Sequence, residues 1–306
     1  MNSRRSFIKK SSLVTIGALN YNFTSILKNI KGVDISVITY SFSPGNEDMN
    51  VIIQNCIDSE SDNIELMGSH IERSIGMPRS NRFSAEWREN VSMKLFKEAK
   101  KLFNEYGGIN IFAYKPNCIG KNNSDGEIEY AMKATKALGA EFLTNELMDE
   151  ESIERVNFFS KKNNVKVAYH AHSNNLGSNV KATDSAWDYA LNSSKNNYVN
   201  LDIGHYINVG GSNNKESLIE FIKRNNKRIS SLHLKDRQAG KSANIAATDN
   251  QIWGFGDTPI IEVLQLIRDN SYKFTSTIEL EYRIPEGSNR VLEVKKCMEY
   301  CKKALS

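Results

Sequence analysis

The sequence predicts a single (β/α)₈ barrel, a closed ring of eight parallel strands surrounded by helices. After residue 32, eight short runs rich in apolar and β-branched residues alternate with longer amphipathic runs. The length agrees, because roughly 270 residues of alternating strands and helices suit such a barrel. The expected strands are residues 33–40, 63–67, 109–114, 141–144, 165–169, 198–203, 229–234 and 274–280. The plainest helices are expected at 84–106, 127–138, 151–163, 216–225, 259–269 and 291–305.

The alternative to a closed barrel is an open, doubly wound parallel sheet. Such sheets commonly carry a glycine-rich phosphate loop after a strand. Neither G-x-G-x-x-G nor G-x-x-x-x-G-K-[ST] follows any expected strand, so the barrel is the preferred interpretation. The cysteines form no C-x-x-C pair and are expected to be buried thiols; they are Cys56, Cys118, Cys297 and Cys301.

Residues 1–31 differ from the rest of the chain, and residues 32–306 are expected to form the barrel domain. The leader has six basic residues and no Asp or Glu. Residues 3–9, SRRSFIK, resemble the twin-arginine export signal S-R-R-x-F-L-K and precede an apolar stretch at 13–19. The sequence therefore predicts an exported, periplasmic protein, with a basic arm of no fixed structure as the alternative.

The charge of the chain is concentrated in this leader. The whole sequence carries +4, and the six basic leader residues leave −2 for residues 32–306. A body that binds nucleic acid is expected to be basic, so nucleic acid is not expected as a partner. No run approaches the roughly 20 apolar residues of a membrane span. The sequence gives no indication of the oligomeric state.

Reactive side chains gather at the ends of the expected strands. All five histidines lie in or just after such an end; they are His70, His170, His172, His205 and His233. Barrel enzymes build their sites on this side, because only there do eight loops surround one opening. Carboxylates buried at the same end would be costly without partners, and a bound cation removes that cost.

The order of these residues resembles a known superfamily. Asp202-x-x-His205, then His233-x-Lys235-Asp236, then a glutamate in the last strand is similar to the xylose isomerase-like barrels. That superfamily includes sugar isomerases and epimerases, inosose dehydratases and endonuclease IV. The segments 38–42 (ITYSF) and 64–68 (IELMG) resemble its first two strands, and the resemblance extends over roughly residues 33–304.

The resemblance implies one divalent metal held by Asp202, His233 and Glu279. Glu279 is preferred to Glu281 because it lies seven residues after Tyr272, as expected for the last strand of the family. The family usually supplies another ligand as a glutamate near the end of the fifth strand, where this chain has His170 and His172. Glu146, from the fourth strand, is the expected fourth ligand, and His170 is the alternative. Mn²⁺, Mg²⁺, Co²⁺ and Zn²⁺ all remain open.

The remaining candidates divide into catalytic and substrate-binding groups. The catalytic candidates are His170, His172, Lys235 and Glu146, and the substrate-binding candidates are His205, Glu65, Trp253 and Glu281. Lys235 either stabilises an enolate or pairs with Glu281. Trp253, in the loop Trp253-Gly254-Phe255-Gly256-Asp257, either stacks on a sugar or anchors the loop.

The chemistry that fits this set is metal-assisted proton abstraction next to a carbonyl. A base moves the proton while the metal stabilises the enediolate. With the resemblance, this predicts a sugar isomerase or epimerase with a small-molecule sugar as substrate. A lyase or dehydratase acting on a keto-sugar or keto-glycoside is the first alternative, and a non-catalytic sugar-binding protein is the second. A nuclease of the endonuclease IV kind would need more histidines and a basic surface.

Overall fold

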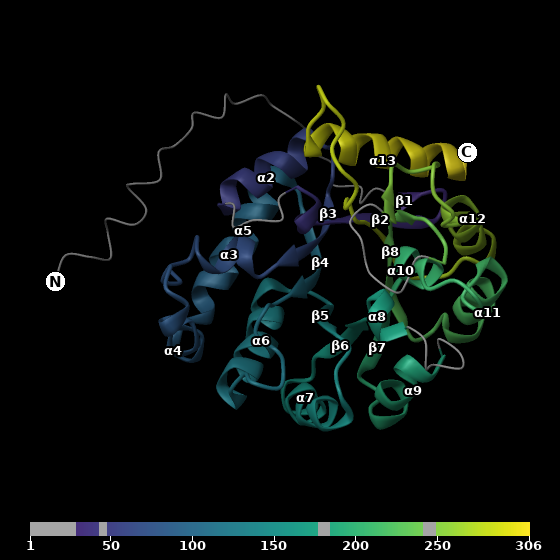
Figure 1. The fold of residues 1–306 in the computed structure, drawn as a ribbon. Coiled ribbons are helices and arrows are strands. Elements are labelled where there is room, and N and C mark those ends of the chain that lie inside the picture. The colour runs from purple at the N-terminus through teal and green to yellow at the C-terminus, as the bar shows by residue number, and fades with distance from the viewer. Residues whose placement is uncertain (1–28, 43–47, 177–183, 241–248) are drawn as a thin grey trace.

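Eight parallel strands close into a ring in the computed structural model, which describes residues 29–42, 48–176, 184–240 and 249–306. They are β2 (Val33–Ile38), β3 (Asn63–Met67), β4 (Asn110–Lys115), β5 (Phe142–Glu146), β6 (Lys166–His170), β7 (Asn197–Asp202), β8 (Ile229–Leu234) and β11 (Thr275–Ile278). Each pairs with the next one in the chain, and β2 closes the ring by pairing with both β3 and β11 (Figure 1). The predicted (β/α)₈ barrel is confirmed.

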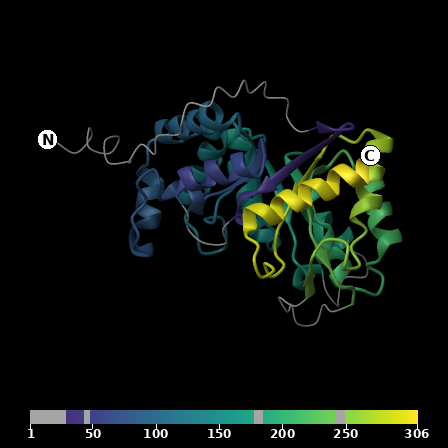
Figure 2. The same ribbon diagram turned by 90° about the horizontal axis from the view of Figure 1, so that it is seen from above.

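Helices surround this ring on the outside (Figures 1 and 2). The longer ones are α2 (Met49–Asp58), α5 (Met93–Gly107), α6 (Asp125–Leu138), α7 (Glu150–Asn163), α9 (Asp184–Ser193), α11 (Lys215–Asn225), α12 (Ile260–Asn270) and α13 (Arg290–Leu305). Shorter elements follow the strands: η1 (Thr39–Ser41), α3 (Ser69–Glu72), η2 (Asn81–Phe83), α4 (Ser84–Asn90), α8 (Ser173–Leu176) and α10 (Ile203–Asn208). Two-residue strands complete the described chain: β1 (Asn29–Ile30) beside β2, and β9 (Asp236–Arg237) beside β10 (Asn250–Gln251).

The prediction of one continuous helix at residues 84–106 is wrong. The structure has two helices, α4 and α5, separated by Val91 and Ser92 in extended conformation. The Ser92 side chain accepts a hydrogen bond from the backbone N–H of Lys94 and so starts a new helix. Within α5, Phe96, Ala99 and Phe103 are buried at helical spacing, which packs this helix against the barrel.

The barrel strands are buried on both faces, as parallel strands covered by helices usually are. Every residue of β3 and of β8 is buried. The four cysteines are buried and form no disulfide, which confirms that they are thiols. The ends of these tightly packed strands therefore give fixed positions from which side chains can meet.

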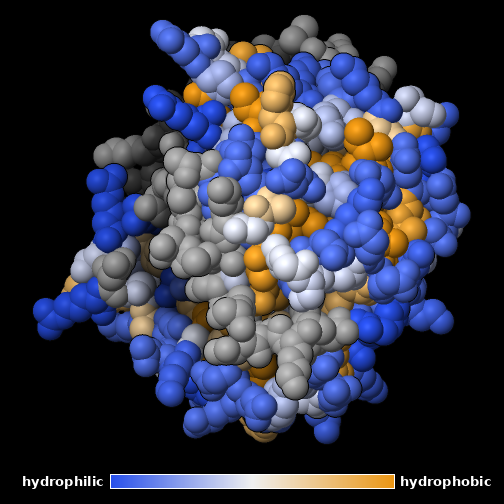
Figure 3. Space-filling view, turned by 45° about the vertical axis from the view of Figure 1, so that its right-hand side comes forward, coloured by the Kyte–Doolittle hydropathy of each residue, from blue (hydrophilic) through white to orange (hydrophobic). Residues whose placement is uncertain are grey.

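Much of the coloured surface on the face drawn in Figure 3 is polar. Figure 3 shows hydrophilic residues over most of the visible face, with small and separate hydrophobic patches. Among the described helices, none combines the length and apolar character that crossing a bilayer requires. The predicted leader, residues 1–31, lies outside the described residues apart from 29–31.

Candidate functional site

Three buried residues from neighbouring strands converge at one end of the barrel. His170 is the last residue of β6, Asp202 is the last of β7, and His233 lies opposite Asp202 in the pairing of β7 with β8. One ligand atom from each lies within 4.8 Å of the other two. Parallel pairing thus aligns the ends of adjacent strands, and the predicted ligands Asp202 and His233 are brought together.

Two carboxylates hold the His233 ring from opposite sides. Its Nδ1 lies 2.9 Å from Glu279 Oε2, and its Nε2 lies 2.8 Å from Glu65 Oε2. Burial disfavours a charge on this ring, but Glu279 and Glu65 raise the pKa of His233 to about 10. The metal-free ring is therefore a cation at neutral pH, and a metal bound through one of its nitrogens takes the place of a proton.

Glu65 was expected to contact substrate, and in the structure it contacts His233. Its side chain is fully buried beneath His233, where it hydrogen-bonds the imidazole. A carboxylate in this position fixes the orientation of a metal-binding histidine. Glu65 therefore acts on the imidazole, whereas the partly exposed Glu281 keeps a position from which it can meet a ligand.

Lys235 is a buried cation among three carboxylates. Its Nζ lies 2.9 Å from Asp202 Oδ2, 2.8 Å from Glu279 Oε2 and 2.9 Å from Glu281 Oε2. Burial opposes its charge, but these carboxylates hold the pKa of Lys235 well above its usual value. Of the two interpretations of Lys235, the structure shows the ion pair with Glu281 and adds two others.

A glycine lets the lysine reach this position. A Cβ at Gly204 would lie 2.3 Å from Lys235 Cγ and 2.8 Å from the Lys235 carbonyl oxygen. Only a residue without a side chain leaves room for the lysine stem against the start of α10. Gly204 stands between Asp202 and His205, so the same short segment that supplies two polar groups also admits the lysine.

The converging residues fit a divalent cation. His170 Nδ1 and Glu65 Oε1 are buried and make no hydrogen bond, whereas Asp202 Oδ2, also buried, is paired with the Lys235 ammonium. Leaving such atoms unpaired is costly, and a coordinated cation would compensate part of that cost. Burial, aided by Lys115, moves the pKa of His170 well below its usual value, so this imidazole is neutral and able to ligate.

Glu146 is not among the converging ligand atoms, which corrects the expectation that it is the fourth ligand. Lys115 Nζ lies 2.6 Å from its Oε1, and His172 Nδ1 lies 3.1 Å from its Oε2. Burial opposes ionisation, but Lys115 and the nearby histidines move the pKa of Glu146 well below its usual range. Both oxygens are thus drawn to other partners, whereas His170, the alternative, lies in the group of residues that could hold a metal.

His172 is the accessible histidine of the site. Its side chain is 40% exposed, and its ring centroid lies 4.8 Å from that of His170 and 4.7 Å from that of His205. One ligand atom from each of these three histidines also lies within 4.8 Å of the others. The Nδ1 of His172 faces Glu146, so the carboxylate orients the ring.

His205 lies deeper, beside Asp202. Its side chain is almost completely buried, its Nδ1 lies 2.8 Å from Ser173 Oγ, and its Nε2 lies 3.9 Å from Asp202 Oδ2. The Nε2 makes no hydrogen bond. Burial, together with the charge of Lys235, moves the pKa of His205 well below its usual value. The ring is neutral and presents one unpaired nitrogen.

Trp253 anchors its loop. It is 6% exposed, and its ring packs against that of Tyr300 on α13 at 5.7 Å between centroids. The Asp236 carboxylate accepts hydrogen bonds from the backbone N–H groups of Gly254 and Gly256 in the same loop. Of the two interpretations of Trp253, the structure therefore favours the one in which it anchors the loop.

Several residues of the site were not predicted from the sequence. Lys115 ends β4 and obeys the strand-end rule that identified the others, so the sequence carried a signal for it. Asn200 lies two residues before Asp202, on the same face of β7, with its Nδ2 3.1 Å from His233 Nε2. Ser173 and Asn208 stand in short helices after β6 and β7, where the sequence carried no signal for them.

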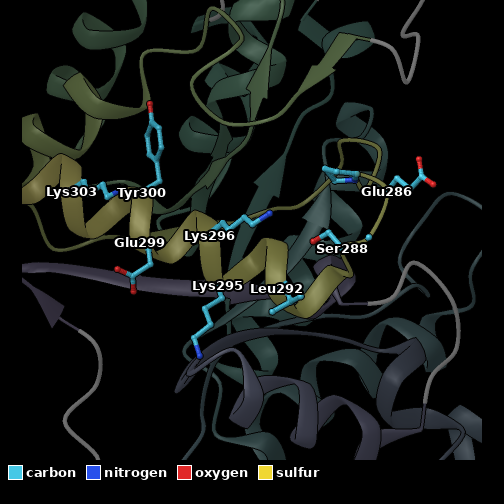
Figure 4. Close-up of a pocket in the computed structure, with 10 residues that line it drawn as sticks. Glu286, Ser288, Leu292, Lys295, Lys296, Glu299, Tyr300 and Lys303 are labelled. Atoms are coloured by element: carbon cyan, nitrogen blue, oxygen red, sulfur yellow. The ribbon is translucent and has the colours of Figure 1, made fainter.

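A depression lies away from the converging residues. It is lined by residues 285–288 and by the side of α13 that carries Leu292, Lys295, Lys296, Glu299 and Tyr300 (Figure 4). None of the converging histidines or of the carboxylates beside them lines it. The chemistry of the described residues is therefore concentrated at the strand ends.

Comparisons with solved structures reveal the same fold in several proteins. The IolI protein with a bound zinc atom aligns at 15% identity over 89% of this chain and 98% of its own, with a TM-score of 0.64. The 3-keto-D-glucoside 4-epimerase YcjR of E. coli aligns at 12% identity over 89% and 99%, with a TM-score of 0.61. A sugar phosphate isomerase/epimerase of Parabacteroides distasonis aligns at 14% identity over 89% and 94%, with a TM-score of 0.56.

The sequence comparisons concern the chain itself. No curated protein gives a significant match to it. A sequence profile of the xylose isomerase-like TIM barrel family matches residues 69–304, which include every strand from β4 onward and all of the converging residues except Glu65. The chain belongs to the xylose isomerase-like TIM barrel family.

Proposed function

We propose that the protein is a divalent-metal-dependent sugar isomerase or epimerase that abstracts a proton next to a carbonyl group. The observation that carries the proposal is the convergence of His170, Asp202 and His233 within 4.8 Å, beside the accessible His172. The named structural neighbours, which include a zinc-bound protein and two epimerase-type enzymes, support the same class.

The proposed metal ligands are His170, Asp202, His233 and Glu279. Two imidazole nitrogens with two carboxylates form a mixed donor set, which suits Zn²⁺ better than Mg²⁺. When bound, the metal supplies the positive charge that stabilises an enediolate. Glu65 holds the His233 ring in place, and Lys235 balances the remaining carboxylate charge.

The proposed base is His172. Glu146 Oε2 lies 3.1 Å from its Nδ1 and orients the ring. Lys115 keeps Glu146 ionised, so Glu146 is a positioning residue for the imidazole. Lys235, the competing candidate, is committed to three ion pairs, whereas the His172 side chain is 40% exposed and within reach of a ligand.

Deuterium incorporation tests this reaction. The metal-loaded protein is incubated in D₂O with a panel of free and keto sugars, and NMR reports deuterium at the carbon next to the carbonyl. The product then distinguishes isomerisation, epimerisation and elimination. If no sugar in the panel exchanges or is converted, the proposed reaction is wrong.

Replacing His172 by Asn is expected to slow this exchange about 10²–10⁴-fold, because a positioned acid–base group contributes that much. Glu146→Gln retains an acceptor for the ring and should slow exchange less. Unfolding curves of both variants check that the fold is kept. Exchange at the wild-type rate in His172→Asn would reject His172 as the base and leave the metal site untouched.

We also propose that residues 1–31 direct export through the twin-arginine pathway, on the basis of the SRRSFIK segment at residues 3–9. Replacing both Arg4 and Arg5 by Lys is expected to retain the protein in the cytoplasm, as measured by fractionation and immunoblotting. Ser3→Ala serves as the control and should be exported. Export of the double variant at the wild-type level would reject the proposal.

A further inference from the structure

We propose that Ser41 is a positioning residue for Glu279, whose backbone its hydroxyl holds in place of a neighbouring strand. The role of Glu279 as a metal ligand rests on the proposed function, whereas the hydrogen bonds of Ser41 do not. Ser41 ends η1, the short 3₁₀-helix that follows β2, and its side chain is buried. Glu279 lies directly after β11.

The ladder between β2 and β11 ends one residue before Glu279. Its last pair is Ile278 with Val37, and β2 itself ends at Ile38, where the chain turns into η1. On the other side, Glu279 still has a backbone partner, because its N–H donates to the carbonyl oxygen of Leu234 at 3.0 Å. The buried backbone groups that face β2 at this level therefore need partners other than a strand.

The Ser41 hydroxyl supplies these partners. Its Oγ donates to the carbonyl oxygen of Ile278 at 3.2 Å and accepts from the backbone N–H of Leu280 at 3.0 Å. A residue of a parallel strand makes the same two bonds with its own N–H and C=O groups. One hydroxyl can replace such a residue, because its oxygen both donates and accepts. The two bonds hold the two peptide groups on either side of the Glu279 Cα.

The backbone of Glu279 is thus held from both edges, by the Leu234 carbonyl and by Ser41. The direction of this backbone sets where the carboxylate points. Glu279 Oε2 lies 2.9 Å from His233 Nδ1 and 2.8 Å from Lys235 Nζ, among the converging residues. A metal ligand must be kept close to its productive geometry, so loss of the Ser41 bonds should weaken the site.

Neighbouring groups hold Ser41 itself in place. Arg290 Nη1 donates to the Ser41 carbonyl oxygen at 3.0 Å, and the Leu280 carbonyl oxygen lies 3.5 Å from the same nitrogen. At the other end of η1, Thr39 Oγ1 accepts from the backbone N–H of Met67, the last residue of β3, at 3.0 Å. The turn is therefore tied to both strands that flank β2, and the Ser41 hydroxyl has a fixed position.

A matched control exists at the other end of the barrel. Ser160, on α7, is also buried. Its Oγ donates to the carbonyl oxygen of Val165 at 2.7 Å and accepts from Asn196 Nδ2 at 3.2 Å. Val165 precedes β6, whereas the converging residues lie at the opposite ends of the strands. Ser160→Ala therefore removes a similar pair of hydrogen bonds without touching the site.

Amide hydrogen exchange of the metal-free protein, followed by NMR, tests the hydrogen bonds. Ser41→Ala is expected to speed exchange at Leu280 and Glu279 by roughly 2–10-fold, the effect of losing one hydrogen bond. Ser160→Ala should leave both amides as they are in the wild type. If the two amides exchange equally slowly in both variants, Ser41 does not hold this segment and the proposal is overturned.

Zinc affinity, measured by isothermal titration calorimetry, tests the consequence for Glu279. Ser41→Ala should bind Zn²⁺ roughly 10–100-fold more weakly, as when a group that supports a metal ligand is lost. Ser41→Thr, which keeps the hydroxyl, and Ser160→Ala should bind as the wild type does. The visible spectrum of the Co²⁺-loaded protein, which reports ligand geometry, should change only in Ser41→Ala. Wild-type affinity in Ser41→Ala, or an equal loss in Ser160→Ala, overturns the positioning role.

The inference and the proposed function fail on different measurements. If the wild type binds no metal, the proposed function is wrong, and exchange at Leu280 and Glu279 still decides whether Ser41 holds the segment. If Ser41→Ala binds Zn²⁺ as tightly as the wild type, the positioning role is wrong and the metal ligands stand. Unfolding curves check each variant, and the two alanine variants decide the outcome if Ser41→Thr does not fold.

Discussion

Replacing Asp202 by Asn is expected to lower the affinity of the protein for Zn²⁺ by more than about 100-fold. Loss of a group that only supports a ligand costs roughly 10–100-fold, and Asp202 is proposed as a ligand itself. One of its carboxylate oxygens lies within 4.8 Å of the ligand atoms of His170 and His233. Isothermal titration calorimetry of the full chain measures the change.

The matched control is Glu299→Gln, a carboxylate-to-amide change on α13. Glu299 is exposed and pairs with Lys302, far along the chain from the strand ends, so the affinity for Zn²⁺ should not change.

Glu146→Gln decides between the two candidates for the fourth metal ligand, Glu146 and His170. With His170 as that ligand, the variant should lose less affinity than Asp202→Asn, at most the roughly 10–100-fold of a supporting group. Binding by Asp202→Asn at the wild-type affinity would reject the metal site.

Replacing Lys235 by Met is expected to lower the free energy of unfolding of the metal-free protein by about 3–5 kcal/mol. Removing one member of a buried ion pair leaves its partners uncompensated, and losses of this size are typical. Lys235 is 2% exposed, and three carboxylates lie within 2.9 Å of its Nζ. Urea denaturation measures the change.

Metal should recover part of this loss. A divalent ion would neutralise the negative charge of the same three carboxylates. In Lys235→Met, this ion no longer competes with the lysine ammonium for them. Zn²⁺ is therefore expected to bind Lys235→Met more tightly than the wild type and to raise its stability by a larger amount. Equal or weaker binding would show that Lys235 organises the ligands and does not compete with the metal.

An exposed lysine provides the comparison for stability. Lys166 Nζ lies 2.8 Å from Glu141 Oε1, as close as Lys235 is to Glu279, but both side chains are solvent-exposed. Exposed pairs contribute about 0–1 kcal/mol, so Lys166→Met should have little effect. If Lys235→Met loses no more than Lys166→Met, Lys235 is not the counter-ion that stabilises the site.

The fold and the location of the site could be predicted because both follow from local patterns. The strands at 63–67 and 229–234 have the predicted bounds, since short apolar runs end sharply at polar residues. Parallel pairing then places the ends of neighbouring strands side by side, so Asp202 and His233 meet. The break of the helix at Ser92 depends on one capping hydrogen bond, which residue spacing alone did not reveal.

The partners within the site could not be predicted, because they come from distant strands. Glu146 was expected to bind the metal, but Lys115, 31 residues earlier, draws one of its oxygens. Glu65 was expected to meet substrate, but it lies beneath His233, 168 residues later in the chain. The sequence pattern shows which side chains lie at the end of the barrel. Which of them pair with one another depends on how side chains from distant strands pack together.

Anomalous diffraction from crystals soaked with Zn²⁺ tests the metal site most directly. We expect one strong peak within coordination distance of His170, Asp202, His233 and Glu279, and we expect this peak to vanish in crystals of Asp202→Asn. Crystals without a bound ion at these four residues, or with the ion held by Glu146 and His172, would contradict the assignment.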